Sequence, residues 1–456
     1  RSISNMKAIT IKEILDSCNG NFIGAEENLN TKVTSIVTDS RQAKENSMFV
    51  AIKGEKVDGH KFVPMTYSQG AVCALVEEKV DCDIPQIVVE STLQAVKDIA
   101  EYYRSLFTIP FIGVTGSVGK TSTKEMLASV LKEKFKVHKT QGNFNNELGV
   151  PLTLFAMEED TEVAIIEMGI SDFGEMTRLS KIVKPNICVI TNIGCCHLEN
   201  LGDRAGVLKA KTEMFKNIQK DGKIFLCGDD DKLSTVKEYK GIAPTFYGLN
   251  DTNKYYGEII ENNSEKGIKC NLHFDGKSIP VTVPAIGNHM VANAMASVAI
   301  GKYLGMTDEE IVRGIESYST IGGRNNVIKT DKYTVIDDCY NANPTSTKAS
   351  IDTIANFSNP RKVCILGDMK ELGKDEIALH KEVGAKAEEC KIDVLITVGD
   401  LAKEMQSQLK NTKGYHFDNN ESLIKELPSI LKDNDAILIK ASHSMHFEEI
   451  VKAITE

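Results

Sequence analysis

The sequence predicts an α/β fold of three domains, and three observations support this prediction. The chain has 456 residues, more than one hydrophobic core ordinarily holds. From about residue 108, short apolar runs alternate with segments of helical spacing, the pattern of a parallel sheet covered by helices on both faces. The alternation restarts near residue 323. We therefore expect domains at 1–107, 108–322 and 323–456.

The first region, residues 1–107, is predicted to be a small α/β domain. Its apolar runs at 33–41, 47–52 and 71–78 are bounded by polar turns and predict strands. Residues 91–107 have apolar spacing near 3.6 and begin with Ser91, a favourable helix N-cap. We expect this helix to lead into the next domain.

The second region predicts a buried parallel sheet followed by a smaller excursion. Its first part holds strands at 109–116, 162–169 and 186–194 and a helix at 120–135. Its later apolar runs, at 223–231, 245–250 and 269–283, predict a smaller antiparallel sheet. An alanine-rich helix at 289–305, ending at Gly305, completes the region.

The third region predicts a second, Rossmann-like α/β unit. Four apolar runs with helices between them predict its parallel strands. These runs lie at 333–337, 362–368, 393–399 and 436–440.

Composition and charge restrict the function classes. A formal net charge of −10 argues against nucleic acid as the main partner, since such proteins usually carry a basic surface. No apolar run reaches the length of a membrane span. The eleven cysteines form no Cys-x-x-Cys pair, which is typical of reduced thiols in the cytoplasm. We expect a cytoplasmic protein that is a monomer, with no membrane insertion.

The stretch from Gly113 to Met126 predicts a phosphate-binding loop. It follows an apolar strand and opens a helix, so free helix N–H groups would point at an anion. Gly116, Gly119 and Lys120 have the Walker A spacing at its carboxyl end, but Val114 stands where that motif has its first glycine. The competing interpretation is a strand-to-helix turn that merely uses glycine.

Three further side chains are candidates for the chemistry. Glu167 ends a predicted buried strand and could bind Mg²⁺, although a lone glutamate there could simply face solvent. His197 follows the next strand, and a lone histidine is more often a packed loop residue than a ligand. Lys211 lies on a predicted helix, where a surface lysine is the default. The shared position of Glu167 and His197 past consecutive strand ends favours a functional role.

A series of motifs then resembles the Mur ligase family over nearly the whole chain. The family's phosphate loop has the shorter form Gly-x-x-Gly-Lys-Thr/Ser, which Gly116 to Thr121 satisfy, so Val114 is no defect. The resemblance implies a small α/β nucleotide-sugar domain, a central P-loop-type parallel-sheet ATPase domain and a C-terminal Rossmann-like domain. The motifs are TDSRQAKENSMFVAIKGEKVDGHKF, TGSVGKTSTKEM, GNFNNELGVPLTL, EMG, TNIGCCHLENLG, AKTEMF, GNHMVANAMA, GGRNN and DDCYNANPTS.

The resemblance also implies roles for individual residues. The implied ATP-binding residues are Thr115, Gly116, Ser117, Val118, Gly119, Lys120, Thr121, Ser122, Asn288, Asn293, Arg324 and Asp338. Lys120, Glu167, His197 and Lys211 are implied to be catalytic. Thr121, Glu167 and His197 would serve two Mg²⁺ ions, joined by Lys211 if it carries a carbamate (N6-carboxylysine), which would make that lysine anionic. The implied substrate-binding residues are Ser40, Arg41, Lys53, Asn145, Asn146, Tyr340, Asn341, Asn343 and Pro344.

Within the family, the sequence is most similar to members that add D-alanyl-D-alanine to UDP-N-acetylmuramoyl-tripeptide. The resemblance thus implies an ATP-dependent amide ligase of peptidoglycan synthesis that works through an acyl phosphate, with those two molecules as its partners. One departure concerns His443, which stands where arginine is common in the family. That departure leaves no basis for giving the position an anion-binding role.

Three alternatives were weighed against this interpretation. The tripeptide-forming Mur ligase has a carboxy-terminal signature, Asp-Asn-Pro-Arg, that is absent here, and Ile365 to Gly373 resemble the dipeptide-adding members instead. Folylpolyglutamate synthase lacks the amino-terminal UDP domain that residues 39–55 resemble. A non-catalytic ATP-binding switch protein would not need Glu167, His197 and Lys211 together.

Overall fold

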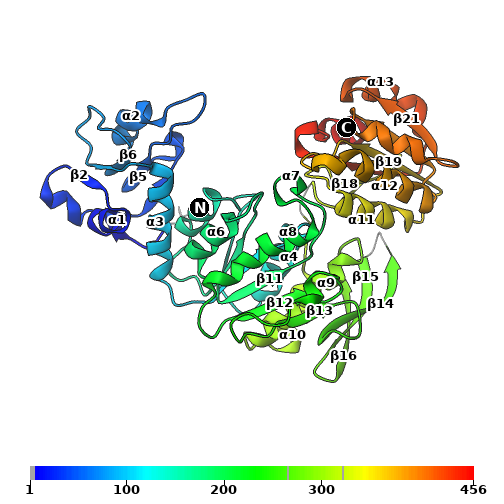
Figure 1. Ribbon diagram of the computed structural model, residues 1–456, viewed down its shortest axis with the longest axis horizontal. Helices are drawn as coiled ribbons and strands as arrows, with labels where there is room; N and C mark the ends of the chain where they lie inside the picture. The colour runs from blue at the N-terminus through cyan, green and yellow to red at the C-terminus, as the bar shows by residue number, and fades with distance from the viewer. Residues whose placement is uncertain (1–5, 264–266, 321–322) are drawn as a thin grey trace.

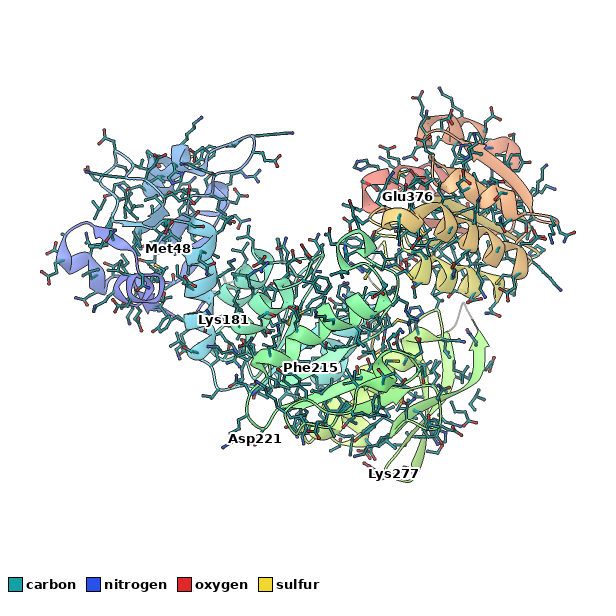
Figure 2. The ribbon with its side chains drawn as sticks, in the orientation of Figure 1. Met48, Lys181, Phe215, Asp221, Lys277 and Glu376 are labelled. Atoms are coloured by element: carbon teal, nitrogen blue, oxygen red, sulfur yellow. The ribbon has the colours of Figure 1, made fainter. Side chains whose placement is uncertain are left out.

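The computed structural model describes residues 6–263, 267–320 and 323–456, which form three α/β units in a row. Figure 1 shows the N-terminal unit in blue and the C-terminal unit in orange and red, on either side of the green central unit. Buried side chains fill each unit: Met48 lies in the N-terminal core and Phe215 in the central core (Figure 2). The predicted α/β class with three domains is confirmed.

The N-terminal unit is built on a five-stranded sheet of order β2-β7-β6-β5-β4, in which β2 is antiparallel to its neighbour. The three predicted strands are confirmed as the parallel strands β4, β5 and β6. Its sheet strands are β2 (Asn21–Ile23), β4 (Ser35–Val37), β5 (Ser47–Val50), β6 (Cys73–Val76) and β7 (Gln86–Val88). Beside them lie β1 (Ile9–Thr10), β3 (Lys32–Val33), α1 (Ile11–Cys18) and α2 (Val63–Ser68).

Helix α3 (Thr92–Ser105) joins the N-terminal unit to the central one, as predicted. It begins at Ser91, whose side chain accepts a hydrogen bond from the Gln94 N–H. Near its other end, the buried Tyr103 hydroxyl donates to the Met157 carbonyl at 2.9 Å. Arg104 Nε donates to the Val183 carbonyl at 2.6 Å. These buried contacts fix α3 to the central unit.

The central unit holds a nine-stranded sheet of order β16-β15-β14-β13-β12-β11-β8-β10-β9 within the described residues. Its strands are β8 (Phe111–Thr115), β9 (Val137–Lys139), β10 (Val163–Glu167), β11 (Ile187–Ile190), β12 (Lys223–Cys227), β13 (Thr245–Gly248), β14 (Tyr255–Asn263), β15 (Gly267–Phe274) and β16 (Lys277–Val283). Its helices are α4 (Lys120–Leu131), α5 (Gly149–Phe155), α6 (Glu175–Val183), α7 (Leu198–Leu201), α8 (Arg204–Thr212), α9 (His289–Tyr303) and α10 (Asp308–Glu316).

One sequence prediction for this unit was wrong. β12 and β13 were expected in an antiparallel excursion, but both pair in parallel and extend the main sheet. The reason is that α8 lies between β11 and β12, and a helical crossover returns the chain in the parallel direction. The antiparallel prediction is confirmed for the run 269–283, which forms β15 and β16, and β14 pairs antiparallel with β15.

The C-terminal unit has a six-stranded sheet of order β17-β18-β22-β19-β20-β21, and the four predicted strands are confirmed as its β18, β19, β20 and β22. β17 is an antiparallel edge strand that the sequence did not reveal. The strands are β17 (Asn326–Lys329), β18 (Thr334–Asp337), β19 (Arg361–Gly367), β20 (Val394–Val398), β21 (Lys413–Phe417) and β22 (Asp435–Lys440). The helices are α11 (Pro344–Ala355), α12 (Glu376–Glu389), α13 (Asn420–Ile430) and α14 (Glu448–Thr455).

The strand order places a switch point at the carboxyl end of β8. This strand lies between β10 and β11, and the chain leaves it toward β9 and β10 before it returns to β11. In open parallel sheets, ligands bind where the direction of winding reverses. The predicted phosphate loop follows β8 directly, so the fold puts it at that point.

Among the described residues, no helix combines the length and apolar character that crossing a bilayer requires. Gly322, which ends the predicted second domain and begins the GGRNN motif, lies outside the described residues.

Candidate functional site

A cleft with a volume of about 1230 Å³ lies over the switch point and is lined from all three units. The N-terminal unit contributes Ile52, Leu93 and Lys97. The phosphate loop and the loops after β10 and β11 line the floor, and residues near β18 and β22 line the C-terminal wall. Most of the sequence-predicted site residues meet here: Ser117, Val118, Gly119, Lys120, Ser122, Asn145, Asn146, Glu167, His197, Asn293, Arg324, Asp338, Tyr340, Asn341 and Asn343.

The phosphate loop needs glycine at two positions. Gly119 has φ 81°, a left-handed conformation that favours glycine, and it immediately precedes α4. At Gly116, an added Cβ would lie 1.8 Å from Thr191 Oγ1, so only glycine allows this close approach. No side chain caps the first turn of α4, which leaves its N–H groups available to an anion.

The loop after β11 braces the phosphate loop. Asn192 accepts from two of its N–H groups, with its carbonyl from Ser117 at 3.1 Å and with its side chain from Val118 at 3.0 Å. Thr191 Oγ1 donates to the Val118 carbonyl at 2.6 Å. These contacts hold the loop in shape without a ligand. Asn192 was not predicted, because an asparagine in a loop has many uses.

The side chain of Lys120 contacts the backbone of the phosphate loop. Its Nζ donates to the Gly116 carbonyl at 3.0 Å and faces the cleft. A lysine at the start of the helix can instead reach the β and γ phosphates of a nucleotide. Thr115, which precedes the loop, is buried, and its Oγ1 has no hydrogen-bond partner in the described part of the chain.

Thr121 and Glu167, both predicted as Mg²⁺ ligands, contact each other directly. Thr121 Oγ1 donates to Glu167 Oε2 at 3.0 Å, and both residues are buried. Asn145 Nδ2 donates to the other carboxylate oxygen at 2.8 Å. The Glu167 N–H donates to Thr140 Oγ1 at 2.9 Å, which fixes the backbone that carries the acid.

Lys124 completes this cluster, and the sequence analysis missed it. Its Nζ lies 3.6 Å from Glu167 Oε2 and donates to the Thr140 carbonyl at 2.8 Å, with only 1% of the side chain exposed. Lys124 lies three residues after Thr121 on α4, so the two share a helix face. That spacing could have revealed Lys124, because a lysine on the same helix face as Thr121 must be buried together with it.

The oxygen donors at Thr121 and Glu167 fit Mg²⁺. This ion prefers oxygen ligands and commonly takes only one or two from the protein, with the rest from water and phosphate. In the described residues, no three His, Cys, Asp or Glu side chains converge as a protein-only metal centre would require. A hydroxyl and a carboxylate beside a phosphate loop therefore suit a cation that arrives with a nucleotide.

His197 lines the cleft from the loop after β11. Its Nδ1 lies 2.6 Å from Glu371 Oε2, a residue of the C-terminal unit. Burial is the main influence on its pKa and lowers it, Lys211 and Lys120 act in the same direction, and Glu371 opposes them. The lowered pKa favours the neutral imidazole, which is the form that can ligate a metal ion.

Lys211 is buried in α8, with 1% of the residue exposed. Burial lowers its pKa to about 8. Within the described chain, no hydrogen bond or ion pair reaches its Nζ. A buried amine of low pKa is partly neutral near physiological pH, and a neutral amine is the form that reacts with CO₂.

The C-terminal wall carries a buried ion pair. Lys440 Nζ lies 2.6 Å from Asp338 Oδ2, and Ser350 Oγ donates to the same oxygen at 2.7 Å. Arg324 lies over the Tyr340 ring at 3.8 Å from its centroid, and Tyr340 in turn packs against His443 at 5.5 Å. Lys440 was missed, because in the sequence it ends an ordinary strand.

Several predicted residues have structural contacts of their own. Asn293 Oδ1 accepts from Thr123 Oγ1 at 3.0 Å, which links α9 to α4 beneath the cleft. Asn146 Oδ1 accepts from the Gly149 N–H at 2.8 Å, at the start of α5. Asn343 caps α11, and Pro344 is the first residue of that helix. These contacts explain why such residue types occur here apart from any ligand.

Four predicted residues lie away from the described cleft lining. Arg41 forms an ion pair with Asp39 at 2.8 Å on the N-terminal unit, next to Ser40. Lys53 lies 3.4 Å from Glu78 on the same unit. Asn288 accepts from Asn262 Nδ2 at 2.8 Å, at the start of α9. The structure does not bring these four to the phosphate loop.

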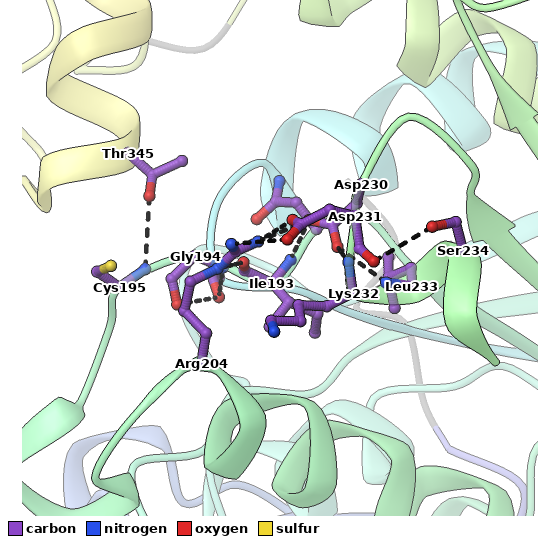
Figure 3. A network of polar contacts seen from close by, with 12 residues as sticks. Ile193, Gly194, Cys195, Arg204, Asp230, Asp231, Lys232, Leu233, Ser234 and Thr345 are labelled. Atoms are coloured by element: carbon purple, nitrogen blue, oxygen red, sulfur yellow. Dashed lines mark hydrogen bonds and ion pairs between the residues drawn. The ribbon is translucent and has the colours of Figure 1, made fainter.

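A polar network anchors the segment that leads to His197 (Figure 3). Asp230 Oδ2 accepts from the Ile193 N–H at 2.8 Å, and Arg204 Nε donates to the Ile193 carbonyl, also at 2.8 Å. Arg204 also pairs with Asp231 at 3.1 Å. The sequence analysis did not single out Arg204 or Asp230, because nothing in the sequence says that the loops after β11 and β12 meet.

Comparison with protein families finds Mur ligase domains along the chain. The Mur ligase family, catalytic domain, matches residues 32–107, the Mur ligase middle domain matches 114–301, and the Mur ligase, glutamate ligase domain, matches 323–443. The chain is 37% identical over 459 residues to UDP-N-acetylmuramoyl-tripeptide–D-alanyl-D-alanine ligase of Bacillus subtilis, covering 98% of both. It is 31% identical to the ligase of that name from Escherichia coli, covering 99% of both.

Solved structures agree with this result. A crystal structure of MurF from Acinetobacter baumannii matches with a TM-score of 0.90 and 31% identity, covering 98% of each chain. MurF ligase from Thermotoga maritima in complex with ADP matches with a TM-score of 0.82 and 28% identity, covering 92% of this chain and 96% of that one. A folylpolyglutamate synthase from Mycobacterium tuberculosis, at 16% identity and a TM-score of 0.63, shares the fold.

Proposed function

The chain belongs to the Mur ligase family, and on that premise we propose its reaction: it joins D-alanyl-D-alanine to UDP-N-acetylmuramoyl-tripeptide, with ATP converted to ADP and phosphate. It is an ATP-dependent amide ligase of peptidoglycan synthesis. The observation that carries this conclusion is full-length identity of 31–37% to ligases named for that reaction. A cleft lined by all three units, with a phosphate loop at its floor, accords with it.

The chemistry follows from the poor reactivity of a carboxylate. One oxygen of the tripeptide carboxylate attacks the γ-phosphorus of ATP, the bond to the β,γ-bridging oxygen breaks, and ADP leaves. The amine of D-alanyl-D-alanine then attacks the acyl carbon of the resulting acyl phosphate. The tetrahedral intermediate loses a proton from nitrogen and expels phosphate. Nitrogen thus replaces one carboxylate oxygen, which leaves in the phosphate.

The floor of the cleft supplies what the first step needs. Two anions must approach each other, so positive charge and N–H donors have to be in place beforehand. Lys120 and the open N-terminus of α4 provide both, and the network of Asn192 with the loop keeps them oriented. Mg²⁺, when bound, screens the charge of the phosphates. Thr121 and Glu167 would hold one such ion.

We propose a second Mg²⁺ position near His197 and Lys211, with Lys211 as its carbamate. Two observations support this proposal. Burial favours the neutral form of the His197 ring by lowering its pKa, and it lowers the pKa of the buried Lys211 amine to about 8. A buried ammonium group with no counter-ion is costly, whereas a carbamate beside a cation is stabilised.

We also propose the remaining assignments. Asn288, Asn293, Arg324 and Asp338 serve the nucleotide, along with residues 115–122. Ser40, Arg41 and Lys53 serve the uridine diphosphate, Asn145 and Asn146 serve the acyl end, and Tyr340, Asn341, Asn343 and Pro344 lie beside the incoming amine. Domain boundaries fall near 107/108 and 322/323. We propose a cytoplasmic monomer, since all eleven cysteines are free thiols, as expected in a reducing compartment.

A phosphate-release assay tests the reaction. The purified protein is mixed with ATP and Mg²⁺, and UDP-N-acetylmuramoyl-tripeptide and D-alanyl-D-alanine are each omitted in turn. We expect phosphate release only when both are present, together with a product heavier by one dipeptide residue. Release that is indifferent to either molecule would contradict the assignment. Running the assay with lysine and with diaminopimelate at the third peptide position identifies the natural tripeptide.

A further inference from the structure

The segment Gly194–Leu201, which carries His197, rests against the C-terminal unit. The Cys195 N–H donates to Thr345 Oγ1 at 3.4 Å (Figure 3), and Cys195 and Leu198 pack against the core beneath α11 and α12. At Gly373, an added Cβ would lie 3.3 Å from the backbone of Glu199. The two units therefore meet backbone to backbone beside the histidine.

The same segment is fixed to the phosphate loop at its other side. The Gly194 N–H donates to Ser117 Oγ at 2.8 Å, and the Cys196 thiol lies 3.2 Å from that oxygen. Asp230 and Arg204 hold the N–H and carbonyl of Ile193. His197 thus lies on a short connection between the phosphate loop and the C-terminal unit.

At the junction, one carboxylate from the C-terminal unit contacts the imidazole. Glu371 Oε2 lies 2.6 Å from His197 Nδ1. Both residues have positive φ, 51° at His197 and 61° at Glu371. Positive φ is uncommon for a glutamate, although histidine adopts it more often than most residues, and it persists where the surroundings impose it. The ring nitrogen and the carboxylate oxygen therefore meet where two constrained backbone positions come together.

The exposure of Glu371 argues against a purely structural role. Its side chain is 60% exposed, whereas that of His197 is 27% exposed. A polar pair this exposed to solvent contributes little to stability, so removing the carboxylate leaves no cavity and no buried unpaired charge. The carboxylate can instead orient the imidazole, because a carboxylate that accepts a hydrogen bond from one ring nitrogen sets the tautomer of the ring.

We propose that Glu371 is a positioning residue for His197: it accepts the Nδ1 proton and leaves Nε2 unprotonated as the atom that can ligate a metal ion. A residue of the C-terminal unit thereby orients a metal-ligating histidine that belongs to the central unit. This inference rests on the proposed metal role of His197. Partners that orient a ligating histidine typically change metal affinity by 10- to 100-fold.

Two readouts on the intact protein test the inference. The first is the tautomer of His197, read from ¹⁵N–¹H correlations of the imidazole nitrogens in ¹⁵N-histidine-labelled protein, with the His197→Ala variant assigning the signal among nine histidines. The second is the affinity for Mn²⁺, from the free-ion electron paramagnetic resonance signal in the presence of ADP. Neither readout needs turnover.

We expect Glu371→Ala to mix the two tautomers and to weaken Mn²⁺ binding about 10-fold or more. Its melting temperature should match that of wild type. Glu371→Gln keeps an oxygen acceptor and should retain the Nδ1–H tautomer. The matched control is Glu404→Ala, which removes an ion pair with Lys381 at 3.6 Å elsewhere on the same unit and should change neither readout.

The outcomes separate the inference from the proposed function. If His197→Ala weakens Mn²⁺ binding but Glu371→Ala leaves affinity and tautomer unchanged, the positioning role is wrong and the metal role of His197 stands. If His197→Ala itself leaves Mn²⁺ affinity unchanged, both the metal role and the inference fall. A Gln variant that loses the tautomer as fully as the Ala variant would also contradict the assignment.

Discussion

The floor of the cleft and the substrate-binding candidates of the N-terminal unit are built in opposite ways. On the floor, Lys124 and Glu167 are each 1% exposed and share hydrogen bonds with Thr121 and Thr140. On the N-terminal unit, Arg41 is 85% exposed and Lys53 is 48% exposed, and each forms a surface ion pair. The floor is held by buried contacts among its own side chains, whereas the N-terminal candidates lie at the surface in exposed ion pairs.

This difference separates two kinds of contribution. Preorganised charge lowers the barrier because it costs no reorganisation during the reaction. Mobile surface charges contribute mainly to binding and are screened by salt. Changes on the floor should therefore affect folding and turnover, and changes on the N-terminal unit should affect the Michaelis constant. The following predictions are ordered by expected size.

The largest effect is expected for Lys124→Met. The substitution leaves the Glu167 carboxylate buried without its cation and the Thr140 carbonyl without its donor. Breaking a buried pair in this way costs about 3–5 kcal/mol of unfolding free energy. Urea unfolding measures this loss, and Lys12→Met, which removes an exposed pair with Asp16, is the control. A loss below about 1 kcal/mol would mean that the floor is not preassembled.

Lys120→Ala should abolish most turnover while the fold stays intact. Lys120 faces the cleft and, within the described residues, donates only to a backbone carbonyl of its own loop, so its removal leaves no buried carboxylate there unpaired. Removing one preorganised donor typically lowers kcat by about 10²–10³-fold. Phosphate release under saturating substrates gives kcat, and thermal unfolding checks the fold. Near-normal turnover would refute the phosphate-loop assignment.

Lys211→Ala should reduce turnover by about two orders of magnitude if the lysine acts as a carbamate. Short carboxylates such as acetate should then restore part of the activity, because they can replace the missing anion. Lys209→Ala, two positions earlier in α8 and beside the Phe173 ring, provides the control. Loss of activity that no short carboxylate rescues would count against the carbamate.

The smallest effect is expected for Arg41→Ala. Its guanidinium is exposed and pairs only with Asp39 among the described residues. We expect the Michaelis constant for the UDP-linked substrate to rise by up to about tenfold, equivalent to 1.4 kcal/mol, with kcat unchanged. Steady-state kinetics at two salt concentrations measure it, and Lys12→Ala is the control. A large fall in kcat would instead place Arg41 with the floor.

Local patterns in the sequence revealed the parts of the site that lie within one strand and the turn after it. Gly116, Gly119 and Lys120 were predicted because a phosphate loop is contiguous in sequence. Glu167 and His197 were predicted because the ends of parallel strands converge at one edge of a sheet. The contact of Thr121 with Glu167 at 3.0 Å agrees with the same rule, although it was not itself predicted.

Contacts between distant loops could not be predicted in this way. Glu371 reaches His197 only because the C-terminal unit docks on the loop after β11, and no local pattern encodes that docking. The role of Lys440 could not be predicted from the sequence, because its partner Asp338 lies 102 residues earlier. The direction of β12 and β13 was predicted incorrectly, because a short apolar run does not indicate whether it pairs with the neighbouring strand in parallel or antiparallel.

The central claim is that ATP activates the tripeptide carboxylate, and isotope transfer tests it most directly. UDP-N-acetylmuramoyl-tripeptide is prepared with ¹⁸O in its terminal carboxylate and is incubated with the protein, ATP, Mg²⁺ and D-alanyl-D-alanine. If an acyl phosphate forms, one ¹⁸O atom per turnover appears in the released phosphate, as mass spectrometry will show. Phosphate that carries no ¹⁸O, in a reaction that still yields the amide product, would contradict the account.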